Sequence, residues 1–262
     1  DFSSYDSLTE LYNRRRLTEE LEKELLRVKR FGYCLSVLLI DIDPQGNAGS
    51  GLGVAIREIE RSIYDVLLGQ AEPGEVIHQT ALKYLDVIPS NRDLAGAEVE
   101  LVSVERREYR LRRGLEALRD EYEYIIIDCP PALSLLTVNA LVASDSVIVP
   151  LQCEYFALEG ISELVNTIEL VKASLNPDLE IEGVVLTMFD GRISIAHQVA
   201  DEARKYFQDR VFETVIPRNV RLSECPSFGK PIILYDLRSK GCESYLSLAR
   251  ELQRREEARS AA

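Results

Sequence analysis

Tryptophan is absent from the 262-residue sequence, and histidine and cysteine are scarce. The two histidines, His78 and His197, are far apart and do not have metal-site spacing, so we expect ordinary histidines. The five cysteines form no C-x-x-C pair, which favours reduced thiols in a cytosolic protein over a disulfide framework. No apolar run approaches the roughly 20 residues that cross a bilayer, so no membrane partner is predicted. Position 1 is aspartate, without a basic-then-apolar leader after it, so we expect no signal peptide and a processed or excerpted chain.

Positive charge is also in deficit, since 31 Lys and Arg residues face 44 Asp and Glu residues, for a net charge of −13. This balance excludes a protein that coats DNA with its whole surface, because such a surface must be cationic. A local basic patch remains compatible with it. The hydrophobic content of 46% is enough to fill a sizeable core, in one large domain or two small ones.

Short apolar runs alternate with amphipathic stretches along the chain. Leu35–Ile42 is nearly all apolar, which is typical of a strand buried on both faces of a parallel sheet. Further strands are predicted at Tyr124–Ile127, Ser146–Pro150, Gly183–Met188 and Val211–Ile216. Helices are predicted at residues 6–31, Val104–Asp120, Gly160–Ser174 and Ala196–Phe207. This alternation predicts an α/β fold with a doubly wound, mostly parallel sheet.

Acidic residues follow two of the apolar runs, where ligands bind in an open parallel sheet. Asp41 and Asp43 end the first run, and alternation along a strand would place both on the same side. Such carboxylates can hold a hydrated Mg²⁺ ion or position a water nucleophile, although an acidic cap of the loop fits them equally well. The run Tyr124-Ile-Ile-Ile-Asp128 ends in one aspartate, which matches the Walker B pattern of a metal-binding acid.

Seven blocks in one order carry a family resemblance. They are Asp43–Ala48 (D-P-Q-G-N-A), Asp93–Leu101, Asp128–Pro131 (D-C-P-P), Cys153–Gly160, Thr187–Arg192, Val215–Glu224 and Pro226–Pro231. From about residue 43 to residue 252 the chain resembles the ParA/Soj partition ATPases. The resemblance implies a P-loop NTPase-like, deviant-Walker ATPase that dimerises around ATP and Mg²⁺, binds DNA non-specifically on the nucleoid and is stimulated by a ParB-type partner.

The resemblance also implies roles for individual residues. Asp43 would orient the attacking water, and Asp128 would be the Walker B acid, so both would be catalytic and both would lie near the metal ion. Pro217, Arg218 and Asn219 would lie against the adenine. The candidates for DNA phosphate contact are Arg192, Arg218 and Arg221, with Lys230 as a weaker one. Scattered surface charge is the alternative for these cations, while a local cluster would reconcile DNA binding with an acidic chain.

The phosphate-binding loop that this family requires is missing. Its K-G-G-x-G-K-[ST] motif surrounds the β- and γ-phosphates with backbone N–H groups and a lysine. No Gly-Gly pair occurs anywhere in the chain, and the sole Gly-Lys pair, Gly229-Lys230, precedes a proline. The glycine-rich run Gly46–Gly53 has no lysine, so we predict a turn there.

The segment that stands where this loop would be expected resembles a different family. Asp6–Arg15, the helix after it and Leu35–Asp43 resemble the opening of a GGDEF diguanylate cyclase domain, over about residues 5–43. The signature hairpin of that family is absent, and Asp41 alone would carry over as a metal ligand. We therefore predict a hybrid. Residues 1–43 would stand in for the N-terminal βα unit, and residues 44–262 would be the ParA/Soj-like part of one structural domain.

The hybrid would lack the family's first strand, which lies beside the Walker B strand, so we expect an unpaired edge in the middle of the sheet. Three functions follow from the sequence. The first is a ParA/Soj-like partition protein with impaired ATP binding and hydrolysis. The second is a pseudo-ATPase that binds DNA or a partner without enzymatic activity. The third, disfavoured by the missing hairpin, is a diguanylate cyclase.

Overall fold

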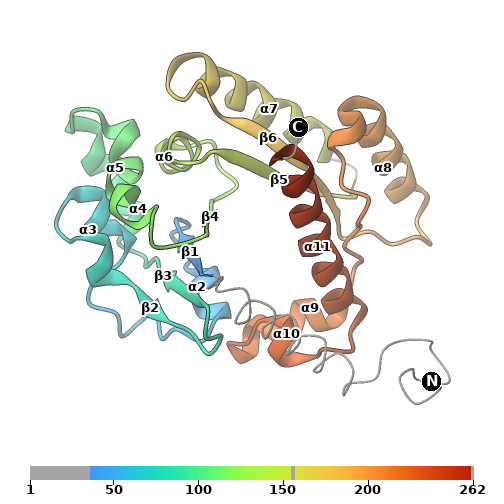
Figure 1. Cartoon of the computed structure of the whole chain (residues 1–262), viewed down its shortest axis with the longest axis horizontal. Helices are drawn as coiled ribbons and strands as arrows, with labels where there is room; N and C mark the ends of the chain where they lie inside the picture. The colour runs from blue at the N-terminus through green and yellow to red at the C-terminus, as the bar shows by residue number, and fades with distance from the viewer. Residues whose placement is uncertain (1–35, 155–156, 261–262) are drawn as a thin grey trace.

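Strand β1, Val37–Asp41, lies at the centre of the larger of two sheets in the computed structural model, which describes residues 36–154 and 157–260 (Figure 1). It pairs in parallel with β3, Leu85–Ile88, on one side and with β4, Tyr124–Asp128, on the other. The two-residue strand β2, His78–Gln79, adds an antiparallel edge to β3. Most of the GGDEF-like segment and the helix predicted over residues 6–31 lie outside the described residues.

The second sheet consists of two parallel strands, β5 (Ser146–Gln152) and β6 (Glu180–Thr187). Within the described residues β4 pairs only with β1, and β5 pairs only with β6. The mid-strand residues Ile126 and Ile148 are 54% and 41% exposed, although such positions are buried inside a continuous sheet. The unpaired edge expected from the sequence is therefore present at β4, and the mostly parallel α/β class is confirmed.

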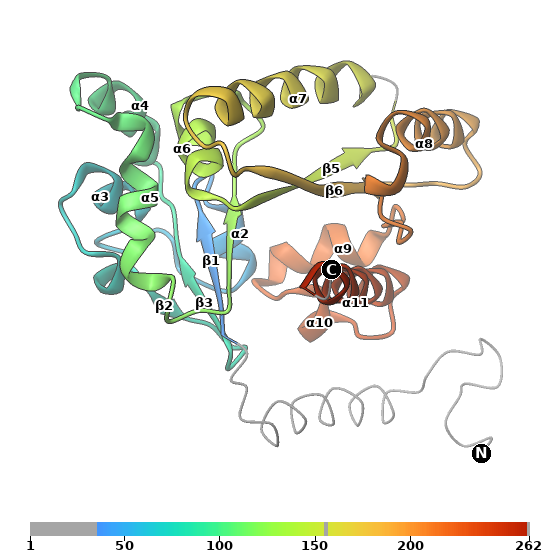
Figure 2. The same cartoon turned by 45° about the horizontal axis from the view of Figure 1, so that its top comes forward.

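Helices surround both sheets (Figure 2). The α-helices are α2 (Asn47–Gly51), α3 (Ile63–Leu68), α4 (Leu94–Glu100), α5 (Arg110–Leu115), α6 (Leu135–Ala143), α7 (Ala157–Ser174), α8 (Ser194–Phe207), α9 (Val220–Glu224), α10 (Ile232–Tyr235) and α11 (Lys240–Ser260). The 3₁₀ turns are η2 (Pro73–Val76), η3 (Leu101–Ser103), η4 (Arg107–Tyr109), η5 (Glu116–Leu118), η6 (Gln208–Arg210) and η7 (Cys225–Phe228). No helix in the described part of the chain is long and apolar enough to span a bilayer.

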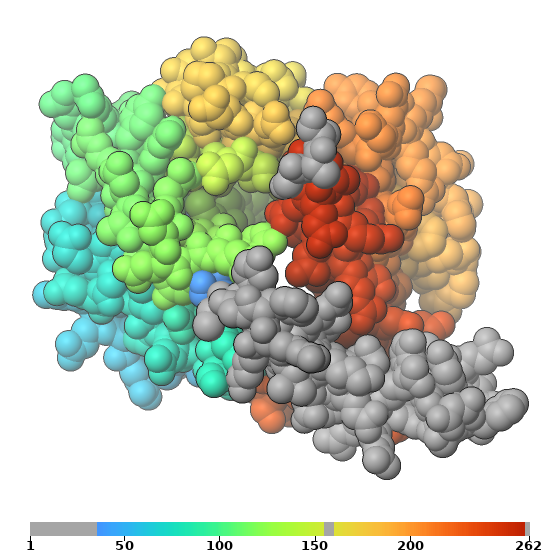
Figure 3. All heavy atoms as spheres, viewed as in Figure 1, coloured from blue at the N-terminus to red at the C-terminus, as the bar shows by residue number. Residues whose placement is uncertain are grey.

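Two of the three hydrophobic clusters in the described residues match the two sheets. The first packs β1 against α3, α4, α5 and α6, with Leu38, Ile40 and Leu111 fully buried. The second packs β5 and β6 against α7 and α8, with Val184 and Leu186 fully buried. In the space-filling view the blue-to-green residues of the first half and the yellow-to-red residues of the second occupy opposite sides (Figure 3).

The strand predicted at Val211–Ile216 does not form. Its backbone is extended and donates two hydrogen bonds to β6, from Phe212 N to the Val184 carbonyl at 2.9 Å and from Ile216 N to the Leu186 carbonyl at 2.8 Å. Between these bonds, the N–H groups of residues 213 and 214 point instead to the Glu251 carboxylate of α11, at 2.8 and 2.9 Å. A side chain from a distant helix thus takes two backbone donors, and the segment keeps one isolated bridge to β6, between Val211 and Val184.

Candidate functional site

The acids at the ends of β1 and β4 lie side by side. Asp41 and Asp128 are partners in the parallel register, because both strands run in one direction and end at the same edge. Asp43 follows two residues after β1, and its charge acts on both other carboxyl groups. The fold therefore brings the sequence-predicted acids together at the carboxyl edge of the first sheet.

Asp41 is fully buried and holds the chain that follows it. Its Oδ1 accepts from the backbone N–H of Asp43 at 3.1 Å, and its Oδ2 accepts from that of Gly49 at 3.0 Å. Gly49 lies in the first turn of α2, where free N–H groups favour a carboxylate. This contact explains why the run Gly46–Gly53, predicted as a turn, contains a short helix. Burial first, and the charges of Asp128 and Asp43 second, raise the pKa of Asp41 to about 6 despite these two bonds.

Asp43 lies in a tight turn rather than in the strand. Its carbonyl accepts from Gly46 N at 2.9 Å and from the Ser90 hydroxyl at 2.5 Å, while its Oδ1 accepts from Gln45 N at 3.0 Å. Gly46 has φ +64°, and a Cβ there would stand 3.1 Å from the Ser90 carbonyl oxygen, so the turn requires glycine. The alternation argument for Asp41 and Asp43 was wrong beyond Asp41, because the strand ends at that residue.

Asp128 ends β4 with an exposed side chain. Its pKa is raised, first because nearby protein atoms displace water and second because Asp43 is negatively charged. Within residues 36–154 and 157–260, no three His, Cys, Asp or Glu side chains group closely enough to hold a metal ion. Two carboxylates suit a hydrated Mg²⁺ ion, which keeps several waters and takes its remaining ligands from a phosphate.

Two backbone donors at this edge of the described chain are not free to bind a triphosphate. The Asp43 and Gly49 N–H groups that face the acids are already bonded to Asp41. The sequence also contains no lysine-bearing glycine loop upstream of β1. The residues present thus fit a magnesium ion in part and do not fit a triphosphate.

The three residues predicted to lie against adenine form an extended connection beyond β6. Arg218 N donates to the Phe189 carbonyl at 2.9 Å, and Pro217 bridges to the same residue. The Asn219 side chain accepts from Arg221 N at 3.0 Å and so caps α9. Among the described residues, no hydrogen bond or ion pair joins this connection to the acids of the first sheet.

Each arginine predicted to contact DNA pairs with a carboxylate of the chain. The Arg192 side chain is 89% exposed and makes two hydrogen bonds to Asp190, which hold the pKa of that carboxyl well below its usual range. Arg218 pairs with Glu154 at 2.5 Å. The guanidinium of Arg221 reaches two acids, Glu224 at 2.9 Å and Asp236 at 3.3 Å. The three side chains are therefore exposed but already partnered.

A family model described as an AAA domain matches residues 31–181. The chromosome partitioning protein ParA of Myxococcus xanthus is 63% identical over 223 residues, which cover 85% of this chain and 79% of that protein. The sporulation initiation inhibitor protein Soj of Bacillus subtilis is 59% identical over 226 residues, which cover 84% of this chain and 89% of that protein. This chain belongs to the ParA/Soj family.

The fold agrees with this membership. A crystal structure of cobyrinic acid a,c-diamide synthase from Mycobacterium smegmatis, with bound ATP analogue and magnesium, is 39% identical with a TM-score of 0.66. The match covers 70% of this chain and 72% of that one. The ParA/Soj chain thus has a P-loop NTPase-like α/β fold. At its N-terminus, residues 3–46 match the model of the diguanylate cyclase GGDEF domain, so both predicted resemblances are confirmed.

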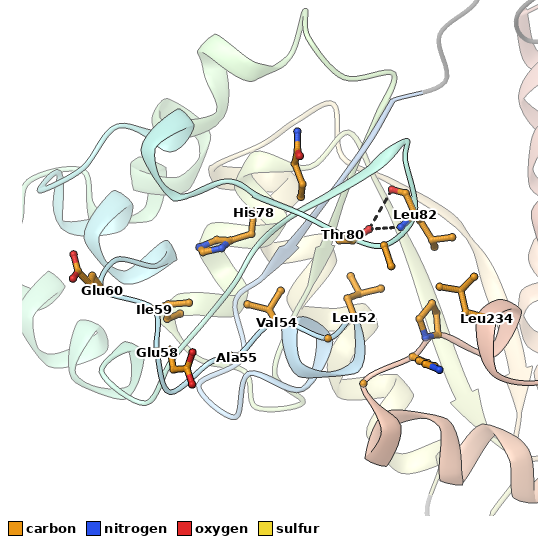
Figure 4. Close-up of a pocket in the computed structure, with 16 residues that line it drawn as sticks. Leu52, Val54, Ala55, Glu58, Ile59, Glu60, His78, Thr80, Leu82 and Leu234 are labelled. Carbon is orange, nitrogen blue, oxygen red and sulfur yellow. Dashed lines mark hydrogen bonds between the residues drawn. The ribbon is translucent and has the colours of Figure 1, made fainter.

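One cavity of the ParA/Soj chain is lined by none of the three acids. It measures about 570 Å³ and is walled by the loop after α2, the β2–β3 connection and the segment before α10 (Figure 4). Leu52, Val54 and Leu82 make it mostly apolar, and the Thr80 hydroxyl donates to the Leu82 carbonyl at 3.2 Å. Lys230, the weaker DNA candidate, lines this cavity.

Sequence reasoning missed Ser90. It is fully buried, and its hydroxyl fixes the carbonyl of Asp43 from the end of β3. One signal was available, since Ser90 follows the apolar pair Val87-Ile88 and a proline, the same strand-end position that the acids occupy. As a short neutral side chain it carries no chemistry of its own, and only the folded turn reveals its contact.

Proposed function

We propose that this chain is a ParA/Soj-type partition protein whose ATP binding and hydrolysis are impaired. The observation that carries the proposal is the pair of Asp41 hydrogen bonds, which occupy the N–H groups of Asp43 and Gly49. The missing lysine-bearing loop supports it, because without that loop and those donors the charge of the β- and γ-phosphates is uncompensated.

ATP and Mg²⁺ are the proposed ligands by family, with weak or lost binding. The Mycobacterium smegmatis synthase, solved with an ATP analogue and magnesium, supports this choice. Asp128 would stand near the magnesium ion and Asp43 near the ion and the attacking water, while Pro217, Arg218 and Asn219 would meet the adenine. The deviant-Walker character belongs to this proposal.

The division of the chain is also proposed. Residues 1–43 replace the N-terminal βα unit, and residues 44–262 form the ATPase-like part. The GGDEF match over residues 3–46 supports a hybrid joined near Asp43, where both families have an apolar strand ending in acids. Diguanylate cyclase activity is not proposed, because the G-G-[DE]-E-F hairpin is absent from the sequence.

The proposed partners follow the family, namely non-specific DNA, a ParB-type protein and a second copy of the chain, in the cytoplasm on the nucleoid. DNA contact is proposed for Arg192, Arg218 and Arg221. The 89% exposure of Arg192 supports it, since a phosphate can displace an exposed carboxylate. Because the triphosphate cradle is missing, we expect DNA binding that ATP does not change.

Phosphate release from ATP tests the proposal. With Mg²⁺, DNA and a ParB-type protein present, we expect phosphate release at the same background rate from the wild-type chain and from Asp43→Ala. The reason is that no triphosphate is bound next to the Asp43 carboxylate. Asp209→Ala, a remote exposed acid in η6, is the matched control. A wild-type rate well above background that disappears in Asp43→Ala and persists in Asp209→Ala would overturn the proposal.

A further inference from the structure

An arginine-lined groove runs along one face of the helical stretch η4–α5–η5. It encloses about 450 Å³ and is lined by Arg106, Tyr109, Arg112, Arg113, Glu116 and Arg119. Apart from the adjacent pair Arg112 and Arg113, successive positions are three residues apart, a spacing that places side chains on one side of a helix. Four arginines face one glutamate there, in a chain whose net charge is −13. We call this surface the arginine groove.

The cations of the arginine groove are largely without counter-charges. Arg119 pairs with Asp145 at 2.8 Å. The exposed side chains of Arg106, Arg112 and Arg113 have no ion pair or hydrogen bond with any described residue. The arginines predicted from the family differ in this respect, since each has a carboxylate partner. Unpartnered guanidinium groups bring five unused donors each to a ligand.

The opposite face of this stretch is fixed to the protein. Leu111 is fully buried, and its N–H donates to Asn139 Oδ1 of α6 at 3.1 Å. The Asn139 amide donates in turn to the carbonyl of Arg107 at 2.9 Å. On the groove side, the Tyr109 hydroxyl donates to the Leu175 carbonyl at 3.1 Å, just after α7. The arginine groove is therefore presented on a fixed frame, which reduces the ordering cost of binding.

Arg106 enters the stretch in a left-handed conformation, with φ 53° and ψ 42°. A non-glycine residue in this region costs about 1 kcal/mol or more and persists where the surroundings determine it. The conformation starts η4 and adds a fourth guanidinium to the end of the groove.

We propose that the arginine groove binds the sugar–phosphate backbone of nucleic acid. From Arg106 to Arg119 the stretch is about 20 Å long at 1.5 Å per residue, which exceeds the reach of a small phosphate ligand and suits several successive phosphates. Arginine forks bind phosphate oxygens in pairs. The proposal deepens the DNA binding proposed above and rests on it, but assigns contact to a surface opposite α11 and outside the family-derived arginines (Figure 2).

Fluorescence anisotropy with a labelled 24-base-pair duplex, over a series of salt concentrations, tests the proposal on the full chain. Arg112→Ala/Arg113→Ala should weaken binding roughly tenfold at low salt and lower the magnitude of the salt slope by about 1.8, since each of the two lost phosphate contacts removes about 0.9. The affinity of Arg112→Lys/Arg113→Lys for the duplex should lie between those of the alanine variant and the wild type. Lysine keeps the positive charge but cannot form the paired hydrogen bonds that arginine makes to a phosphate. The matched control is Arg250→Ala/Arg254→Ala, which removes two exposed, unpaired arginines of α11. Circular dichroism checks that all variants remain folded.

The variants separate this proposal from the broader one. A loss of duplex affinity that occurs only in Arg192→Ala/Arg221→Ala would contradict the proposal for the arginine groove and support the family-derived DNA contact. If the α11 control weakened duplex binding equally, the effect would be one of net charge, and this result would also contradict the proposal for the groove. A wild-type chain without affinity for the duplex would overturn both DNA proposals. Tighter binding of a poly-glutamate peptide than of the duplex would show that the groove takes an acidic protein instead.

Discussion

Asp41 has a structural role at the sheet edge where the sequence predicted a metal ligand. As a sequence feature it resembles a metal ligand, and in the fold it bonds two backbone N–H groups and is buried beneath the turn. Burial, and after it the charges of the neighbouring acids, raise its pKa. The acids Asp43 and Asp128 could be found from strand-end position alone, whereas the burial of Asp41 required α2 to fold back over it.

The raised pKa of Asp41 makes a prediction about stability. Because its folded pKa is about 6 against an ordinary value of 3.8, the folded state holds an extra proton between these pH values. Stability from this group is therefore greatest in acid and falls as pH rises from about 4 to about 7, by about 3 kcal/mol at 1.36 kcal/mol per pKa unit.

Denaturant unfolding at pH 4.5 and pH 7.5 measures this effect in the wild type and Asp41→Asn. The variant replaces one acceptor with an amide, so it should be less stable at both values, and its loss should be smaller at pH 7.5, where the wild type carries a buried charge. A penalty that is equal at the two pH values would contradict the raised pKa. Asp209→Asn is the control, since that exposed carboxyl in η6 is remote from Asp41.

At the scale of elements, the break between the two sheets is the main departure from a continuous doubly wound sheet. It could be foreseen, because a strand was missing from the order of blocks in the sequence. The failure of residues 211–216 to form a strand could not be foreseen, because their apolar run is typical of a strand. The Glu251 carboxylate that accepts hydrogen bonds from this segment belongs to a helix nearly 40 residues later. The helix predicted over Val104–Asp120 is likewise divided into η4, α5 and η5, and its break at Arg106 depends on a local backbone conformation.

The open edge of β4 predicts association between chains. Ile126 is exposed in mid-strand, and an apolar strand edge without a neighbour pairs with other strands. Ile126→Lys should therefore weaken concentration-dependent self-association roughly tenfold in sedimentation velocity, because an edge lysine opposes strand pairing. Leu170→Lys, an exposed apolar position on α7, should have little effect. Similar sedimentation of both variants and the wild type would contradict an edge contact.

For the whole molecule, family membership and the nucleotide site give different answers. The ParA/Soj blocks cover most of the chain in order, and the relatives and the fold agree with them. The fold class and the strand-end acids were accordingly predictable from the sequence. The hydrogen bond from Gly49 N–H to Asp41 was not, because it joins residues eight positions apart and no motif encodes it.

Calorimetric titration of the purified chain with ATP and Mg²⁺ tests the central claim most directly. The account predicts no saturable binding of ATP at concentrations below about 1 mM, a limit that corresponds to a binding free energy of about −4 kcal/mol. The acids remain, but the phosphate-binding loop is missing from the sequence, and the Asp43 and Gly49 N–H groups are already bonded to Asp41. The Mycobacterium smegmatis synthase, solved with an ATP analogue and magnesium, is the positive control. Micromolar, magnesium-dependent binding that is lost in Asp128→Asn would contradict the account.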